Sequence, residues 1–368
     1  MTLPWKSFAY CAVICLAALA PSNDLAFAQN HGAVSAPVNA EKPRVVILTT
    51  GGTIAGQANA RSEIGYTSAQ VDGSQLILGV PGIDTLAQIS SERIASIGSQ
   101  DMTDAIWLTL AARISTLFAN NEADGVVVTH GTDTVEETAF FLDLVLAPGK
   151  PVVLVGAMRP STAIGADGPA NLYDAVKVAA SPSAHDRGVL VVMYGTIHAA
   201  RDAQKIHTTA LEAIRSPNFG PVGYVNAASV RFSTLAPPPR SKLYSPGSTP
   251  PLPRVDIIYA HAQMDGAMID DAVKRGARGL VLAGAGEGNC SQPAAEALQR
   301  AVARGIVVVR ASRTGAGFVN RNVEVDDDKL GFVASLDLNP QKARILAQLL
   351  IANHITDAAA VQRAFAER

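Results

Sequence analysis

The stretch that decides the fold runs from Val45 to Gln57 and reads VVILTTGGTIAGQ. An uncharged run leads into Gly51 and Gly52, and the hydroxyl of Thr53 follows immediately. A short apolar run without polar alternation is typical of a strand buried on both faces of a sheet. Paired glycines allow positive φ and let a ligand approach the backbone closely. The stretch therefore predicts a buried strand that ends at a substrate-binding loop.

The same pattern recurs along the chain. Further apolar runs are GVVVTH (125–130), PVVLVGAM (151–158), GVLVVMYG (188–195), VDIIYA (255–260), GLVLAGAG (279–286) and IVVVRAS (306–312). They alternate with helical stretches such as DAIWLTLAARISTLFA (104–119), TVEETAFFLDLVLA (134–147) and NPQKARILAQLLIANH (339–354). Strands that alternate with helices predict an α/β fold with parallel sheets.

A proline-rich segment at 236–254 interrupts this rhythm and can continue neither a helix nor a sheet. We interpret it as a linker between two domains. The larger N-terminal domain, 43–235, is expected to contain a mostly parallel sheet with flanking helices. The smaller C-terminal domain, 255–368, is expected to be parallel α/β as well.

The N-terminus has the pattern of a secretory signal. Lys6 precedes the apolar run FAYCAVICLAALA, and small residues stand at Ala26 and Ala28. We expect residues 1–28 to be a signal peptide cleaved after Ala28, which predicts a periplasmic or secreted protein whose flexible mature start is 29–42. A membrane anchor is the alternative, but a spanning helix needs roughly 20 apolar residues.

Charge and composition narrow the function classes. The chain has 30 Lys and Arg against 32 Asp and Glu, so its net charge of -2 favours neither nucleic acid nor an anionic membrane. Cleavage would leave Cys290 as the one cysteine, without an internal disulfide. The histidines show no ligand spacing, and GGTIAG and GAGEG lack the glycine spacing of a dinucleotide loop. We therefore expect neither a metal nor a cofactor.

Two strand ends carry polar side chains. Thr53 follows the first, and Thr132 with Asp133 follows the run at 125–130. Ligands of open α/β sheets bind at such carboxyl ends. Thr53 is either a nucleophile or a turn and capping residue. Thr134 and Glu137 predict a capping box for the next helix, which explains their presence without catalysis.

A threonine nucleophile needs a proton acceptor. Lys205, in RDAQKIHTT, is the best-placed candidate by topology, although a lysine taken alone is usually a solvated surface charge.

Seven stretches together carry a family resemblance. They are TTGGTIAG (49–56), GSQDM (98–102), VVVTHGTDTVEETAFFLDL (126–144), PVVLVGAMRPSTAIGADGPANLYDAV (151–176), RDAQKIHTT (201–209), EVDD (324–327) and LNPQKARIL (338–346). In this order and spacing, the chain resembles the bacterial type II L-asparaginases from about residue 44 to its end. The resemblance implies hydrolysis of L-asparagine to L-aspartate and ammonia.

The resemblance also implies catalytic roles. Thr53 matches the primary nucleophile, while Thr132 and Asp133 match the second threonine and its aspartate. Either threonine is able to attack first, and the sequence does not decide between them; we favour Thr53 because the glycines beside it expose it. Lys205 matches the lysine that completes their relay, and Tyr66 matches a tyrosine that hydrogen-bonds the first threonine from a mobile loop.

Substrate binding is implied for a further set of residues. Ser99 and Gln100, together with Thr132 and Asp133, match positions that hold the amino and carboxylate groups of the substrate. Asn289 and Glu324 match residues that a second subunit contributes, in a family that is typically homotetrameric. The implied partners are therefore a small-molecule substrate and further copies of this chain.

The resemblance leaves the substrate preference open. Relatives that also hydrolyse glutamine tend to have glutamate at the position of Gln100 and serine at that of Asn289. This chain is therefore expected to prefer L-asparagine, with weaker L-glutamine hydrolysis; a dual glutaminase-asparaginase is the alternative. Glu287 stands where relatives often have a neutral residue, and its charge could weaken carboxylate binding. An exported amino-acid-binding protein, or a structural or adhesive protein, would give the polar residues no reason to converge.

Overall fold

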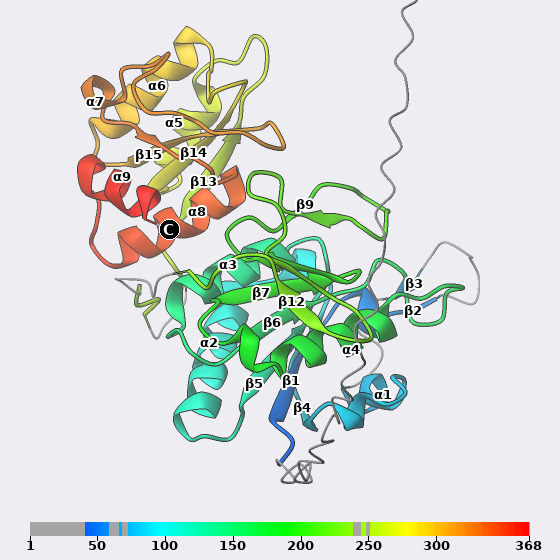
Figure 1. The fold of residues 1–368 in the computed structure, drawn as a ribbon. Coiled ribbons are helices and arrows are strands. Elements are labelled where there is room, and N and C mark those ends of the chain that lie inside the picture. The colour runs from blue at the N-terminus through cyan, green and yellow to red at the C-terminus, as the bar shows by residue number, and fades with distance from the viewer. Residues whose placement is uncertain (1–40, 59–65, 68–72, 238–243, 248–250, 368) are drawn as a thin grey trace, which may run out of the picture. The chain divides into compact units, whose positions relative to one another are not determined.

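A computed structural model describes residues 41–58, 66–67, 73–237, 244–247 and 251–367 (Figure 1). Lys42–Arg368 form one compact unit. The predicted signal peptide at 1–28 and nearly all of the predicted flexible start at 29–42 lie outside the described residues. Within the described part of the chain, no helix is long and apolar enough to cross a membrane.

The larger sheet has eight strands in the order β12-β11-β8-β7-β6-β5-β1-β4. Five of them run parallel: β4 (Gln88–Ile97), β1 (Arg44–Gly51), β5 (Gly125–Thr129), β6 (Val152–Val155) and β7 (Val189–Met193). The other three, β8 (Thr196–Ala199), β11 (Gly223–Val225) and β12 (Val230–Phe232), pair antiparallel. All residues of β5, β6 and β7 are buried, as the unbroken apolar runs predict.

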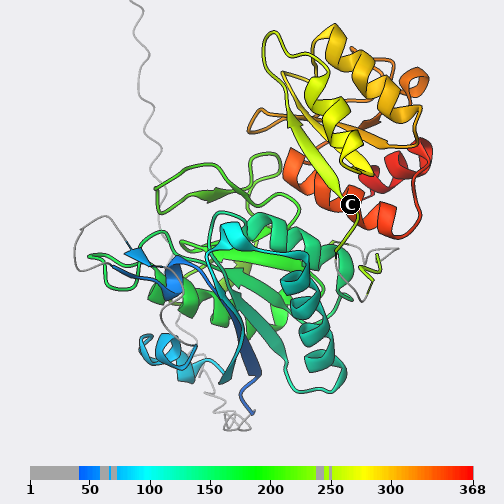
Figure 2. The same ribbon diagram turned by 180° about the vertical axis from the view of Figure 1, so that it is seen from behind.

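Helices cover both faces of this sheet (Figures 1 and 2). They are α1 (Gly73–Leu78), α2 (Asp104–Ala119), α3 (Val135–Val145) and α4 (Gly168–Ala179). Alternate residues of β1 belong to different cores: Leu48 packs in a cluster with residues of α2 and α3, while Ile47 packs in a cluster with residues of α1 and α4. Burial on two faces explains why these strands lack polar alternation.

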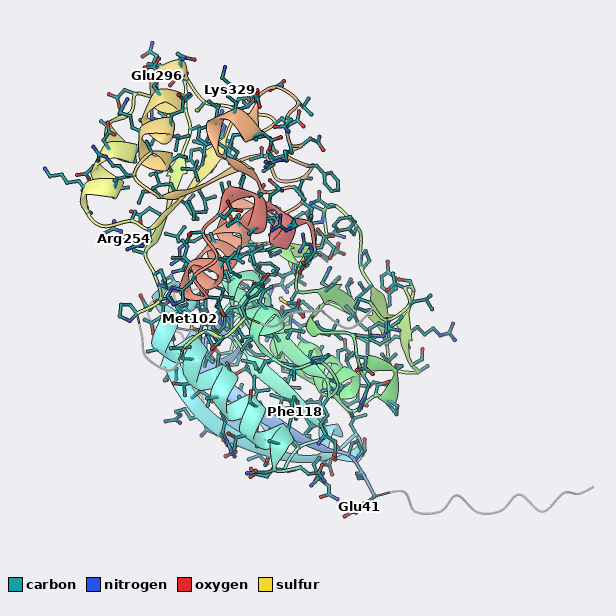
Figure 3. The ribbon with its side chains drawn as sticks, turned by 90° about the vertical axis from the view of Figure 1, so that its left-hand side faces the viewer. Glu41, Met102, Phe118, Arg254, Glu296 and Lys329 are labelled. Atoms are coloured by element: carbon teal, nitrogen blue, oxygen red, sulfur yellow. The ribbon has the colours of Figure 1, made fainter. Side chains whose placement is uncertain are left out.

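The smaller sheet is parallel throughout. Its strands are β13 (Val255–Tyr259), β14 (Gly279–Gly284), β15 (Val307–Ser312) and β16 (Val333–Ala334). Its helices are α5 (Ala267–Lys274), α6 (Gln292–Val302), α7 (Asp327–Leu330), α8 (Pro340–Ala352) and α9 (Ala358–Ala366). Figure 3 locates α6 and α7 by the labelled Glu296 and Lys329. The predicted α/β class, with a large mostly parallel sheet and a smaller parallel one, is confirmed.

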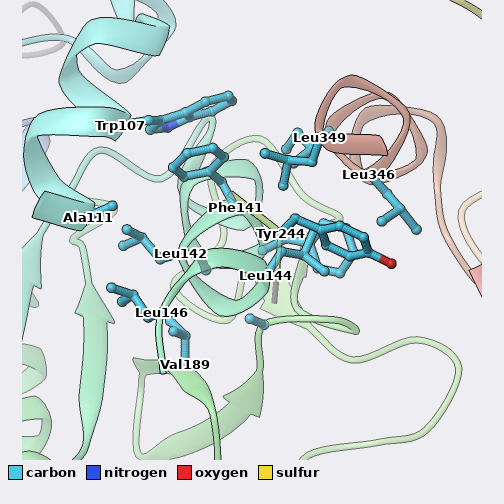
Figure 4. Packing of buried hydrophobic residues seen from close by; sticks show 14 of the residues in the cluster. Trp107, Ala111, Phe141, Leu142, Leu144, Leu146, Val189, Tyr244, Leu346 and Leu349 are labelled. Carbon is cyan, nitrogen blue, oxygen red and sulfur yellow. The ribbon is translucent and has the colours of Figure 1, made fainter. Parts of the chain in front are cut away.

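Helix α8 packs on both α3 and β14. Around α3, Trp107 stacks on Phe141 with ring centroids 5.0 Å apart, and Leu346 and Leu349 of α8 complete the same cluster (Figure 4). The cluster continues through Val281 of β14. One hydrophobic core is therefore shared by elements of the two sheets.

The described parts of the proline-rich segment also join this core. Tyr244 and Leu252 are buried, and their backbone N–H groups donate to Leu144 O at 3.1 Å and Asp104 Oδ2 at 2.9 Å. The segment is therefore fixed to α2 and α3 at these two points. The division into domains at 43–235 and 255–368 stays a prediction.

Short elements lie in the connections between the main strands and helices. They are η1 (Thr53–Ala55), β2 (Gln57–Ala58), β3 (Tyr66–Thr67), η2 (Ile83–Thr85), η3 (Ser99–Asp101), η4 (Pro182–Ala184), β9 (Gln204–Lys205) and β10 (Ile214–Arg215). Several of them carry the residues singled out by the sequence.

Candidate active site

A pocket of about 550 Å³ opens where β1 and β5 end. It is lined by Gly52, Thr53, Gly98, Ser99, Gln100, Gly131, Thr132, Asp133, Ala157, Met158, Lys205, Thr208 and Thr209. Thr53 lies in η1 directly after β1, whereas Thr132 and Asp133 follow β5. Since β1 and β5 are parallel neighbours, their carboxyl ends bring both threonines to one edge of the sheet.

Glycines let the loops approach one another closely. Gly52 has φ of 80°, and a Cβ at this position would lie 2.4 Å from the backbone nitrogen of Gly131. A Cβ on Gly131 would in turn lie 2.6 Å from the hydroxyl of Ser99. Only glycine fits both positions, so three loops that are distant in sequence form one wall of the pocket.

Lys205 reaches the pocket from β9. Its Nζ donates hydrogen bonds to Thr132 Oγ1 at 2.9 Å and to Asp133 Oδ1 at 2.5 Å. The Lys205 side chain is only 17% exposed, whereas that of Asp133 is 61% exposed. Lys205 is therefore not a solvated surface charge, and the threonine, lysine and aspartate that the resemblance pairs are in direct contact.

The expected capping box at the start of α3 is wrong. Thr134 occupies the N-cap position, but its side chain caps no backbone N–H of the helix. Its hydroxyl instead donates to Ser99 O at 2.7 Å. The hydroxyl donates to a carbonyl that is distant in sequence rather than accepting from a helix N–H, and it joins the loop after β5 to η3.

The predicted substrate-binding residues of η3 line the pocket. Ser99 is buried, whereas Gln100 is exposed, and its Nε2 donates to Asp101 Oδ2 at 3.4 Å. Tyr66 lies in β3, which pairs antiparallel with β2 through Ala58. The position of the Tyr66 side chain lies outside what the structure describes, so its contact with Thr53 stays a prediction.

Asn289 and Glu324 are not among the pocket-lining residues of their own chain. Asn289 Nδ2 donates to Glu324 Oε2, so the two side chains form one polar pair near β14. Glu287 does not join them, because its Oε1 accepts from the backbone N–H of Asn320 at 3.1 Å and from its side-chain amide at 2.5 Å. Its charge is thus engaged by Asn320.

His130 was not singled out by the sequence analysis. It is fully buried, and burial lowers its pKa to about 4, so the ring is neutral. Trp107 Nε1 donates to Thr138 Oγ1 at 2.8 Å, and that hydroxyl lies 2.8 Å from His130 Nε2. Gly131 O can only accept, so Nδ1 carries the proton and donates to it at 2.7 Å, and Nε2 accepts from the Thr138 hydroxyl. This chain of hydrogen bonds fixes the peptide that precedes Thr132.

Asp167 supports the opposite wall. Its carboxylate accepts from the backbone N–H groups of Met158 and Arg159 and from Asn171 Nδ2. Among the described residues, no group of three or more His, Cys, Asp or Glu side chains is arranged to hold a metal ion. The described pocket offers hydroxyls, one amine and one carboxylate, a set suited to acyl transfer through a hydroxyl.

Comparison with known proteins agrees with this chemistry. The N-terminal asparaginase family model matches residues 44–237, and the glutaminase/asparaginase C-terminal domain model matches residues 254–365. The chain belongs to the asparaginase family. It is accordingly an amidohydrolase, and the family supports the hydrolysis of L-asparagine.

Three similar proteins show the range of this asparaginase family. "Probable L-asparaginase periplasmic" of Haemophilus influenzae is 45% identical over 85% of this chain and 89% of its own length. "L-asparaginase 2" of Escherichia coli is 44% identical over 84% and 89%. "Glutaminase-asparaginase" of Pseudomonas fluorescens is 41% identical over 88% and 90%.

Among solved structures, the chain is similar to a crystal structure described as a probable cytoplasmic L-asparaginase from Campylobacter jejuni. The TM-score is 0.81 with 42% identity, covering 89% of this chain and all of the other. The names of the similar asparaginases thus differ in compartment and in glutaminase activity.

Proposed function

We propose that this asparaginase hydrolyses L-asparagine through a threonine nucleophile, Thr53, and an acyl-enzyme intermediate. The observation that carries the proposal is the contact of Lys205 Nζ with both Thr132 and Asp133 in the pocket that Thr53 also lines. Acyl transfer to a hydroxyl and then to water requires groups that move protons in the same pocket, and this cluster supplies them for the water step.

In the first step, Thr53 Oγ1 forms a bond to the side-chain amide carbon of the substrate. Backbone N–H groups beside the nucleophile stabilise the oxyanion. The hydroxyl proton passes to the amide nitrogen, the carbon–nitrogen bond breaks, and ammonia leaves. In the second step, water activated through Thr132, Lys205 and Asp133 attacks the ester carbon, and its proton returns to Thr53 as L-aspartate is released.

Positioning of the substrate supplies much of the rate. Ser99, Gln100 and Asp133 hold its amino and carboxylate groups. Asn289 and Glu324 of a second subunit complete the site, in a homotetramer. The low burial of Asp133 supports this arrangement, because its carboxylate is available to a ligand as well as to Lys205.

We expect L-asparagine to be preferred, because the chain has Gln100 and Asn289. A dual glutaminase-asparaginase is the second candidate, and the similarity to "Glutaminase-asparaginase" of Pseudomonas fluorescens favours it. One methylene in a pocket is worth only about 1–3 kcal/mol, so weak glutamine hydrolysis is expected even of an enzyme that prefers L-asparagine. The export signal at 1–28 and a periplasmic or secreted location belong to the same proposal.

The test is ammonia release by the purified mature protein, residues 29–368, with L-asparagine and L-glutamine compared over a range of concentrations. Thr53→Ala and Thr132→Ala should each lower kcat about 10⁴- to 10⁶-fold, the scale of removing one member of a nucleophile–base constellation. Thr109→Ala is the matched control, since Thr109 is exposed on α2. Turnover by Thr53→Ala at the wild-type rate would overturn the nucleophile assignment, and equal rates with both substrates would replace asparagine specificity with the dual activity. Mass spectrometry of the exported protein checks cleavage after Ala28.

A further inference from the structure

The first turn of α8 contacts both polypeptide segments that form the lysine and aspartate part of the site. Asn339 is its N-cap, and the side chain accepts from the backbone N–H of Lys342 at 3.1 Å. Gln341 Nε2 donates to Glu136 Oε1 at 2.7 Å, on α3. Lys342 points to the other segment, which leads to Lys205.

Lys342 is only 2% exposed, although it carries an ammonium group. Its Nζ donates to Arg201 O at 3.0 Å and to Ala203 O at 2.5 Å. These carbonyls lie four and two residues before Lys205 in the sequence. The buried amine therefore fixes the backbone that leads directly into β9.

Glu136 is the corresponding group on α3. It is 3% exposed and stands three residues after Asp133. Burial raises its pKa, while the charge of Lys342, the Gln341 and Asn339 amides and a hydrogen bond from the backbone N–H of Lys205 lower it. The same carboxyl group accepts from Gln341 Nε2 and Asn339 Nδ2, so it joins the first turn of α8 to the helix that follows Asp133.

Contacts other than those of Lys342 also hold α8 in place. The Arg201 guanidinium forms a two-fold contact with the buried carboxylate of Asp337, at 2.7 and 2.8 Å. Leucines of α8 also pack in the core beside α3. A methionine could fill the same volume without the cost of burying an amine. The distinctive contribution of Lys342 is to hold two particular backbone carbonyls.

We propose that Lys342 and Glu136 are positioning residues for the reaction, which fix the backbone of residues 201–205 so that Lys205 Nζ meets Thr132 and Asp133. The inference rests on the proposed function, in which Lys205 is catalytic. A displacement of about 1 Å in such a group can lower a rate about 10²-fold. Neither positioning residue lines the pocket, so neither is expected to touch the substrate.

The test compares Lys342→Met with Gln348→Met. Gln348 is a matched control, since it is equally buried two turns further along α8 and donates to a backbone carbonyl, Pro253 O, away from the pocket. Lys342→Met should lower kcat for L-asparagine about 10- to 100-fold while KM changes less than about 3-fold. Gln348→Met should leave kcat within about 2-fold of the wild type, even if its melting temperature falls as far as that of Lys342→Met. Equal kcat values in the two folded variants would overturn the inference.

Glu136 gives a second, independent measurement in case Lys342→Met does not fold. Glu136→Ala should lower kcat, and Glu136→Gln should recover much of it, because the amide oxygen still accepts from Gln341 Nε2 in the first turn of α8. Wild-type kcat in Glu136→Ala would contradict the positioning role.

A double-mutant cycle separates this inference from the proposed function. If Lys342 acts through Lys205, then Lys342→Met should have little further effect in a Lys205→Met background. Full activity of Lys205→Met alone would refute the catalytic role of Lys205. If Lys205→Met loses activity and Lys342→Met then lowers kcat by its full factor in that background as well, only the positioning role is refuted.

Discussion

The buried ion pair of Arg310 and Asp327 gives the sharpest stability prediction. Its side chains are 3% and 0% exposed, and the guanidinium donates to Asp327 Oδ1 at 2.7 Å and Oδ2 at 2.8 Å. It also donates to the carbonyls of Glu287, Gly288 and Asn320. Arg310→Met would leave these three carbonyls without that donor and would bury an unpaired carboxylate.

Breaking a fully buried pair from one side costs about 3–5 kcal/mol of unfolding free energy. Arg113 with Glu92 is the matched control, because these side chains are 30% and 36% exposed, and such surface pairs contribute about 0–1 kcal/mol. Urea unfolding of Arg310→Met and Arg113→Met should show this difference at neutral pH. Removing both buried charges, in Arg310→Met with Asp327→Leu, should restore much of the loss, since no uncompensated charge remains.

Two outcomes would refute this reasoning. One is an Arg310→Met variant that loses less than about 1 kcal/mol, the range of an exposed pair. The other is a double variant that is less stable than Arg310→Met alone. Because Arg310 joins the loops that carry Asn289 and Glu324, the single variant should also raise KM for L-asparagine, which steady-state kinetics on the folded fraction would show.

Two further predictions concern the backbone and pH. Gly52→Ala should lower kcat/KM by about 100-fold or more, because its Cβ would overlap the Gly131 backbone. Gly82→Ala is the control, since Gly82 has a similar φ of 75° and its added Cβ would meet nothing within 4 Å. It should cost about 1 kcal/mol of stability and leave kcat/KM unchanged. Burial lowers the pKa of His198 to about 4, from an ordinary value near 6.5. Between these two pH values the unfolded chain binds a proton at His198 that the folded chain does not bind. The free energy of unfolding therefore falls as pH drops from about 6.5 to 4. His198→Asn should make that fall shallower by about 3 kcal/mol in urea unfolding measured across this range, and an unchanged slope would contradict the assignment.

The sequence predicted the parallel part of the fold well because burial on two faces leaves a local signature. The apolar run at 125–130 contains β5, and the helical stretch at 104–119 coincides with α2. The reversal after β7 was missed. There, Tyr194 and Gly195 turn the chain into the antiparallel strand β8 with φ of 50° and 70°, and a residue other than glycine at positive φ gives little warning in sequence.

The candidate site was predictable only to the extent that it lies at strand ends. Thr53 and Thr132 follow apolar runs, so their meeting follows from the parallel order of β1 and β5. The role of Lys205 rested on resemblance, because a contact across 73 residues has no periodicity. The predicted capping box was wrong for a similar reason, since the Thr134 hydroxyl donates to Ser99 O, a carbonyl 35 residues away, instead of accepting from an N–H of its own helix.

The buried charges show where this fold departs from a simple apolar core. Lys342 of α8 and Arg310 of β15 are buried cations that donate to backbone carbonyls of segments that carry polar site residues. Buried carboxylates accompany them, Glu136 on α3 and Asp327 on α7. Apolar side chains would fill these positions with less desolvation, but they cannot hold a carbonyl in one direction. Hydrogen bonds from a buried cation can hold a carbonyl in one direction, because each donor fixes both the distance and the angle of its acceptor. The position of Lys205 relative to Thr132 is accordingly decided by side chains that line no part of the pocket. Substitutions in the first turn of α8 should therefore change kcat as well as the free energy of unfolding.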